Sequence, residues 1–151
     1  MTPRAVAPVL VIAVGNPSRG DDAIGPELAA RLEAAALPGV EVLVDFQLQV
    51  EHAVDLLGRE QVLFVDAGTD TPAPFELSPV QPAAEYLHTS HALPPAAVLA
   101  ASLQVHHQAP PPARLLCVRG EHFELGAPLS AAASAHLEAA WAALLAACTA
   151  R

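Results

Sequence analysis

Basic residues and cysteines are scarce in this sequence of 151 residues. Lysine and arginine together number seven and are scattered, against 16 acidic residues, which gives a formal net charge of −9. Proteins bind phosphate backbones through clusters of basic side chains, so this composition argues against a nucleic-acid partner. The two cysteines, Cys117 and Cys148, lie in apolar surroundings, which favours buried, reduced thiols over a disulfide framework.

Two further absences concern disorder and membranes. Only 15% of the residues are charged and 53% are hydrophobic, a composition that argues against a disordered chain. No apolar run approaches the roughly 20 residues needed to span a bilayer. The run that ends at Val14 lacks the small-residue cleavage site of a signal peptide. We therefore expect a cytoplasmic protein without membrane contact, folded as a single domain over residues 1–151.

The stretch around residues 9–26 organises the prediction for the rest of the chain. Residues 9–14 are apolar without alternation, which indicates a strand buried on both faces of a parallel sheet. Turn-forming residues follow at 15–18, and then Asp21 and Asp22 stand where the next helix should begin. Ligand sites in open α/β sheets lie at the carboxyl ends of the strands, so this connection is the first place to look for function.

The remaining segments alternate between strand and helix patterns. The expected elements are strands at 40–44, 62–65, 75–77 and 114–118, with helices from Pro26 to about 36, at about 50–57, at 94–106 and from Ser130 onward. We read the 75–77 strand as a short edge strand, and Glu27 and Arg31 as an exposed i,i+4 ion pair. The order predicts an α/β fold, a three-layer α/β/α sandwich around a mainly parallel, twisted sheet of about five strands.

Three candidate functional groups can meet under this topology: Asp22 after the first strand, Asp66 after the third, and His91 in the loop before the 94–106 helix. Each also has a simpler explanation. Asp22 suits a helix N-terminus, Asp66 suits a turn, and a loop histidine is commonly a surface residue. Two carboxylates and an imidazole form a ligand set suited to zinc, nickel, cobalt or cadmium, with positions left open for chemistry. Spacing alone indicates a metal or acid–base site of unknown purpose.

The ordered set of motifs resembles one family, the nickel–iron hydrogenase maturation proteases, which trim the hydrogenase large subunit. The resemblance covers nearly the whole chain. Its segments are Gly15-Asn16, Asp21-Asp22, Ile24-Gly25-Pro26, Val65-Asp66-Ala67-Gly68, Ser90-His91, Arg119-Gly120 and Phe123-Glu124-Leu125-Gly126. Residues 45–51 look like the subgroup that serves soluble, NAD-linked or cofactor-coupled hydrogenases.

The resemblance implies a cytoplasmic, monomeric endopeptidase that removes a C-terminal extension from the large-subunit precursor after nickel insertion. The three positions of the family that contact the metal fall on Asp22, Asp66 and His91, which are also the candidate catalytic residues. The first is often glutamate in relatives, so this chain departs from the pattern by one methylene. Nickel is expected to arrive within the substrate, with no organic cofactor. The resemblance also implies that no serine or cysteine nucleophile is used, and we expect an aspartyl-type or metal-assisted endopeptidase, although the motifs do not decide the chemical mechanism.

The sequence leaves two alternatives open. Peptidyl-tRNA hydrolases also have an apolar strand that runs into Gly-Asn-Pro, as residues 14–17 do in this chain, but they require a nearby histidine and a basic surface. In this sequence Asp21 and Asp22 occupy that region and the net charge has the opposite sign. The other alternative is a chaperone that inspects the nickel site without cleaving the precursor. A gel assay of precursor size separates it from a protease.

Overall fold

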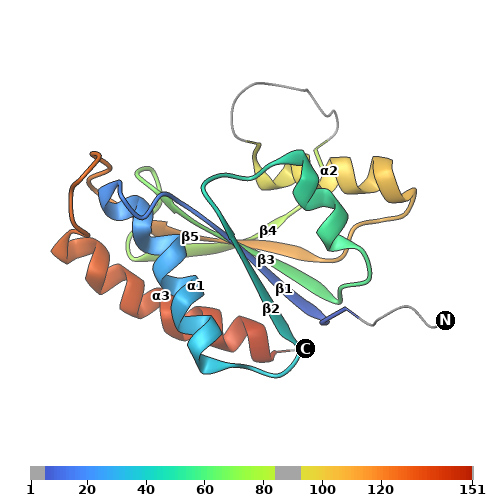
Figure 1. The fold of residues 1–151 in the computed structure, drawn as a ribbon, viewed down its shortest axis with the longest axis horizontal. Helices are drawn as coiled ribbons and strands as arrows, with labels where there is room; N and C mark the ends of the chain where they lie inside the picture. The colour runs from blue at the N-terminus through green and yellow to red at the C-terminus, as the bar shows by residue number, and fades with distance from the viewer. Residues whose placement is uncertain (1–5, 84–92, 151) are drawn as a thin grey trace.

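Five strands form the middle layer of the structure, a computed structural model that describes residues 6–83 and 93–150 (Figure 1). They are β1 (Val9–Val14), β2 (Val40–Asp45), β3 (Gln61–Gly68), β4 (Phe75–Val80) and β5 (Ala113–Arg119). Their order across the sheet is β2-β1-β3-β5-β4. All neighbouring pairs are parallel except β4–β5, which is antiparallel. The prediction of a mainly parallel sheet of five strands is confirmed.

Helices cover both faces of this sheet. They are η1 (Gly20–Ala23), α1 (Ile24–Ala35), η2 (Val50–Leu56), α2 (Pro95–His106) and α3 (Ala131–Thr149). Helices α1 and α3 lie on one face, and η2 and α2 lie on the other (Figure 1). Every residue of β1 is buried because alternate side chains enter the two cores: Val11 packs on the α1/α3 side and Ile12 on the α2 side. An uninterrupted apolar strand is therefore what this single-domain, three-layer sandwich requires.

Helix α3 packs against α1 and the sheet through its apolar face. Ser130 caps its N-terminus, where the Ser130 Oγ accepts a hydrogen bond from the Ala133 N–H at 3.1 Å. By length and composition alone α3, with 19 residues and an 18-residue stretch of mean hydropathy 1.3, could cross a membrane. Core helices pass the same test, and α3 buries Leu137 and Leu144 in the core with α1 and the sheet. Its length is therefore explained by that packing.

Several sequence predictions need correction. The predicted Glu27–Arg31 pair is wrong, because the Arg31 guanidinium donates to the Glu138 carboxylate of α3, with Nη1 and Oε2 2.9 Å apart. The short helix predicted at about 50–57 is present as the 3-10 helix η2, which needs no correction. Strand β3 runs on through Gly68, beyond the predicted end at Val65, because it pairs with β5 as far as Gly68 opposite Arg119. Asp66 thus lies within the strand.

The carboxyl ends of β1 and β3 lie side by side in the sheet. The chain turns from β1 toward the β2 edge, and from β3 it continues toward the β5 side. This is the point at which open α/β sheets form a crevice for ligands. The fold therefore directs attention to the residues that follow β1 and those that end β3.

Candidate functional site

Asp22 and Asp66 line the same pocket at this crevice. The pocket has a volume of about 530 Å³. Its lining residues are Val14, Asp22, Phe46, Gln47, Leu48, Asp66, Ala67, Leu93, Pro94 and Pro95. Asp22 follows β1 and Asp66 lies in β3, 44 positions away, so their meeting depends on the sheet topology predicted from the sequence. Within the described residues, neither carboxylate forms an ion pair with a basic side chain.

Asp22 is held by a tight connection between β1 and α1. It lies in η1, and its Oδ2 accepts a hydrogen bond from the Asn16 N–H at 2.7 Å. Gly15 permits this close approach, because a Cβ at that position would lie 2.0 Å from the Asp22 carbonyl oxygen and the Gly15 φ is +150°. The Gly-Asn pair of the motif thus has a structural purpose: it brings the strand end against the backbone and side chain of Asp22.

Asp66 projects from the α2 face of β3, two residues beyond the buried Phe64. Burial raises the pKa of its carboxyl from 3.8 to about 6. The nearby charge of Asp22 acts in the same direction, and the hydrogen bond from the Ala67 N–H to Asp66 Oδ1, at 2.8 Å, opposes both. Near neutral pH Asp66 can therefore exchange a proton, which is the property required of a general acid or base.

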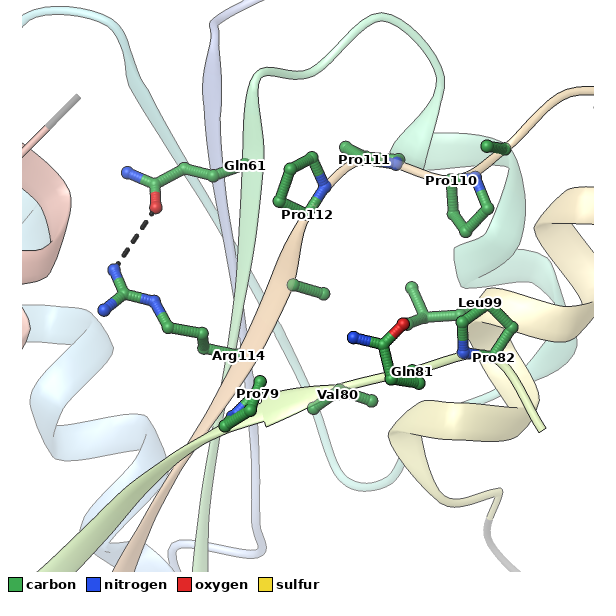
Figure 2. Close-up of a pocket in the computed structure, with 12 residues that line it drawn as sticks. Gln61, Pro79, Val80, Gln81, Pro82, Leu99, Pro110, Pro111, Pro112 and Arg114 are labelled. Carbon is green, nitrogen blue, oxygen red and sulfur yellow. Dashed lines mark hydrogen bonds between the residues drawn. The ribbon is translucent and has the colours of Figure 1, made fainter.

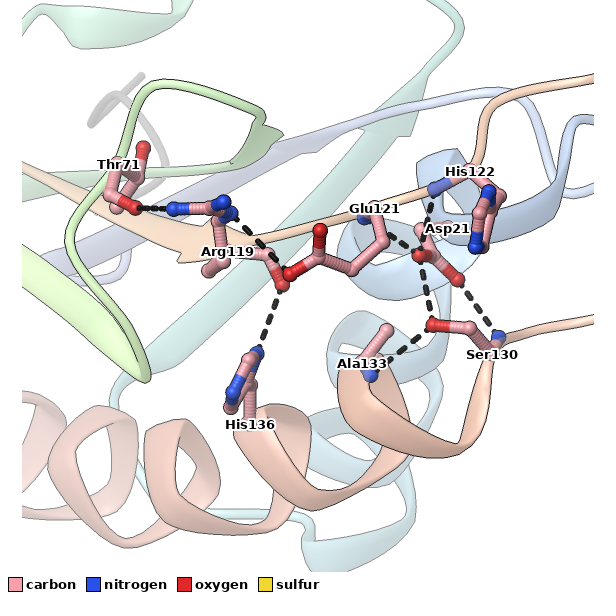
Figure 3. Close-up of polar contacts among 8 residues, drawn as sticks. All are labelled: Asp21, Thr71, Arg119, Glu121, His122, Ser130, Ala133 and His136. Atoms are coloured by element: carbon pink, nitrogen blue, oxygen red, sulfur yellow. Dashed lines mark hydrogen bonds and ion pairs between the residues drawn. The ribbon is translucent and has the colours of Figure 1, made fainter.

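Asp21, the neighbour of Asp22, has a different role that the sequence did not reveal (Figure 3). Its side chain is fully buried. Its Oδ2 accepts hydrogen bonds from the N–H groups of Glu121 and His122 and from the Ser130 hydroxyl, at 2.7 to 3.0 Å, and its Oδ1 accepts one from the Ser130 N–H at 2.7 Å. Burial by itself would raise the pKa of Asp21, but these hydrogen bonds hold it below the ordinary value. Asp21 therefore joins η1 to the start of α3.

Cys117 lies opposite Asp66 in the β3–β5 register and is only half-buried, where the sequence indicated a buried thiol. Its Sγ is 2.8 Å from the Thr71 Oγ1. Burial raises the pKa of Cys117 despite this hydrogen bond, and the charges of Asp66 and Glu76 raise it further. The thiolate is therefore disfavoured, which argues against a cysteine nucleophile at this site.

Arg119, at the end of β5, contacts both the β3–β4 loop and the loop that follows β5. Figure 3 shows its guanidinium between Thr71 and Glu121: Nη1 donates to the Thr71 carbonyl at 3.0 Å, and Nε lies 3.3 Å from Glu121 Oε1. The Arg119 carbonyl is 3.1 Å from His136 Nδ1 of α3. The Arg-Gly segment of the motif thus connects the β3–β4 loop to the loop after β5 and to α3.

The third predicted site residue, His91, lies outside the residues that the structure describes. The described ranges, 6–83 and 93–150, contain no cluster of three His, Cys, Asp or Glu side chains able to hold a metal ion. Asp22 and Asp66 supply two carboxylates, and one imidazole added to them would make a set suited to borderline ions such as nickel or zinc. The role of His91 stays a prediction.

Residues 45–51, which carry the subgroup resemblance, were not predicted to be part of the site. Phe46, Gln47 and Leu48 line the pocket, and so do residues 93–95 at the start of α2, where the Leu93 N–H donates to the Leu48 carbonyl at 3.4 Å. Of these three, Leu48 is buried, whereas the Phe46 side chain is 67% exposed. The available signal was the pair of apolar residues, Phe46 and Leu48, among polar ones just after a strand, but this pattern does not distinguish a pocket wall from a core contact.

A second pocket, of about 560 Å³, lies at the opposite end of the sheet (Figure 2). Prolines dominate its wall, and its polar side chains are Gln61, Gln81 and Arg114. The Arg114 Nη2 donates a long hydrogen bond of 3.4 Å to the Gln61 Oε1. None of the described residues that line this pocket is an acid, a histidine or a nucleophile, so it offers no groups for hydrolysis.

Comparison with solved structures shows which proteins share this architecture. The chain is similar to the hydrogenase maturating endopeptidase HybD from E. coli, with 26% identity and a TM-score of 0.70 over 92% of this chain and 90% of that one. These structural neighbours support the resemblance of the chain to the hydrogenase maturation proteases. The same fold occurs in the NiFe hydrogenase maturation protease HycI from Thermococcus kodakarensis, at 21% identity and a TM-score of 0.68 over 91% and 90% of the two chains.

Another relative by fold is the hydrogenase 2 maturation peptidase from a Thaumarchaeota archaeon, with 23% identity and a TM-score of 0.67 over 93% of this chain and 97% of that one. No protein-family model and no curated protein matches the chain by sequence. The family resemblance stated from the motifs is confirmed, and the enzyme class of these maturation proteases is that of an endopeptidase.

Proposed function

We propose that this endopeptidase removes the C-terminal extension of a nickel–iron hydrogenase large-subunit precursor, and that it does so after nickel has been inserted. The observation that carries the proposal is the pair of carboxylates, Asp22 and Asp66, in one pocket at the carboxyl edge of a maturation-protease fold. The nickel belongs to the precursor and is part of the substrate.

The proposed roles follow from the chemistry of each group. Among the described residues, Asp22 accepts a hydrogen bond from the Asn16 N–H on Oδ2, which leaves its other oxygen to a metal-bearing substrate. Asp66 combines burial with a pKa of about 6, so it suits proton transfer to or from water and the scissile amide. His91 is proposed as the third group that recognises the precursor's nickel. An imidazole completes a donor set that nickel accepts more readily than magnesium or calcium.

The arrangement also supports a metal that is shared rather than resident. A permanent catalytic metal normally has second-shell hydrogen bonds that orient each ligand. Within the described part of the chain, Asp66 receives only the Ala67 N–H, from its own neighbour. We therefore expect the isolated protein to hold divalent ions weakly, so that nickel in the precursor becomes the condition for cleavage.

The test uses metal-free protein and two forms of one precursor, one loaded with nickel and one without it. Loss of the extension is followed by mass spectrometry. The expected result is cleavage of the loaded form alone. Equal cleavage of both forms would overturn nickel recognition. Strict dependence on zinc bound to the protease would identify an ordinary metallopeptidase, and binding without shortening would identify the non-cleaving chaperone.

Matched variants assign the carboxylates. Asp66→Asn keeps the shape of the side chain and removes the charge and the titrating proton, so it should abolish processing. Asp70→Asn is the control, because Asp70 is an exposed aspartate just beyond β3 that does not line the pocket. His91→Ala should also abolish processing with an unchanged melting temperature. Normal processing by either Asp66→Asn or His91→Ala would remove that residue from the site.

A further inference from the structure

A small apolar pocket adjoins the site and shares Phe46 with it. Its volume is about 250 Å³, and it is lined by Gly15, Pro17, Pro26, Val44, Asp45 and Phe46. Typical pockets for cofactors and drug-sized ligands start at about 300 Å³. The size therefore suits one side chain of a larger molecule better than a separate small ligand.

Among the described residues that line this pocket, Asp45 alone carries a charge, and it is already engaged. Its Oδ1 accepts the Phe46 N–H at 2.7 Å, and its Oδ2 lies 3.5 Å from His52 Nε2. The His52 Nδ1 accepts the Gln49 N–H at 2.9 Å, so the proton of a neutral imidazole lies on Nε2, directed at Asp45. Because the Asp45 carboxylate is engaged by the Phe46 N–H and by His52, the remaining lining that the pocket presents to a ligand is apolar.

The backbone around Phe46 is fixed although the ring is exposed. The Gly15 N–H donates to the Asp45 carbonyl at 3.0 Å, and the Leu93 N–H donates to the Leu48 carbonyl at 3.4 Å. Pro17 and Pro26 restrict the opposite wall. The Phe46 and Val44 side chains are 67% and 48% exposed. An exposed aromatic ring on an ordered loop is a feature of binding hot spots, because little conformational entropy is lost when a partner covers it.

We propose that this pocket, with Phe46 at its border, is a specificity subsite that takes an apolar side chain of the precursor within three residues of the scissile bond. The inference rests on the proposed function. We assign the occupant to the precursor because Phe46 lines both pockets, so the apolar pocket adjoins the pocket of Asp22 and Asp66. In an extended peptide, side chains on one side recur every second residue, about 6.6 Å apart, so one chain can pass the carboxylates and still fill the neighbouring pocket.

The test measures kcat and KM for nickel-loaded precursor with four variants. Phe46→Ala should lower kcat/KM about tenfold or more, mainly through KM, and Phe46→Leu should restore most of that loss. Val44→Ser tests the other side of the pocket and should lower kcat/KM severalfold. Val54→Ala on η2 is the matched control, since Val54 is 60% exposed but lines neither pocket. It should leave the kinetics unchanged.

A second arm replaces each of the three precursor residues on either side of the scissile bond by aspartate, one at a time. With the wild-type enzyme, aspartate at one apolar position of the precursor should lower kcat/KM about as much as Phe46→Ala does with the wild-type precursor. When that precursor is combined with the Phe46→Ala enzyme, kcat/KM should fall little further, as expected for two residues in contact. Wild-type kinetics in Phe46→Ala, or strictly additive losses at every position, would overturn the subsite and leave the proposed function intact. Failure of the wild-type protein to shorten loaded precursor would overturn both.

Discussion

Asp21 and Asp66 lie at the same edge of the sheet, and the pKa values of their carboxyl groups are shifted in opposite directions. Both are removed from water, yet the pKa of Asp21 is lowered and that of Asp66 is raised to about 6. The difference lies in the donors: within residues 6–83 and 93–150, Asp21 accepts four hydrogen bonds from three residues, whereas Asp66 accepts one from its own neighbour. Burial alone does not decide the role of a carboxylate. The number of donors around it separates a structural acid from a reactive one.

The largest expected effect is the loss of Asp21. Asp21→Ala leaves the N–H groups of Glu121, His122 and Ser130 without their acceptor, at a cost of about 1–3 kcal/mol for each group that stays buried. We expect the free energy of unfolding to fall by about 3–5 kcal/mol, a large part of the stability of a typical domain. Urea denaturation measures it. A loss below about 1 kcal/mol would contradict the structural role of Asp21.

The next effect has the opposite sign. Asp66→Asn removes a buried charge while keeping an oxygen for the Ala67 N–H, so the variant should be more stable than the wild type at pH 8. The rise in pKa from 3.8 to about 6 sets an upper limit of about 3 kcal/mol. The same variant should be inactive. A destabilised Asp66→Asn would show that the ionised carboxylate has partners beyond the Ala67 N–H.

The two aspartates should also give opposite dependence on pH. Asp66 has a folded-state pKa above its unfolded value, so its contribution to stability is complete below about pH 4 and is lost as the pH rises through 6. Asp21 has a lowered pKa, so its contribution is present above about pH 4 and is lost as the pH falls through the folded value. Unfolding of Asp66→Asn and Asp21→Asn at pH 3, 5 and 8, each against wild type, measures both slopes. Slopes of equal sign would refute the comparison.

The smallest expected effect concerns Asp22. Asp22→Glu adds the methylene found in many relatives, at a partly exposed position whose Oδ2 accepts the Asn16 N–H. We expect the free energy of unfolding to change by less than about 1 kcal/mol and processing to be retained. Denaturation and the precursor assay report the two quantities. Complete loss of processing would show that the shorter carboxylate is matched to this pocket.

The sequence predicted the fold better than the details of the site. The prediction of a buried strand at Val9–Val14 is correct, because a short apolar run that ends in turn residues is typical of a strand with both faces covered. The end of β3 was placed too early, because Asp66 is polar and the pairing that extends the strand comes from β5, far along the chain. Asp22 and Asp66 could be brought together from topology alone.

Other features were beyond local reasoning. The partners of Asp21 lie 100 to 109 positions away, so the adjacent aspartates looked equivalent in the sequence. The true partner of Arg31 is 107 positions away, and the nearer Glu27 was chosen wrongly. The place of Phe46 in the pocket depends on backbone hydrogen bonds that hold its loop, and hydrophobic periodicity does not predict such bonds. The family resemblance, in contrast, used the order of short motifs and was confirmed.

The hydrogen bonds of Asp21 also bear on the order in which the enzyme is completed during synthesis. The segment next to Asp22 is fixed by the backbone of residues 121, 122 and 130, so η1 reaches its final form only after the chain has been made as far as Ser130. Contacts of such long sequence separation form late, because the loop-closure entropy must be overcome first. A nascent chain that ends before residue 121 lacks all the donors that fix Asp21, so the segment next to Asp22 would be unfinished until those residues are made.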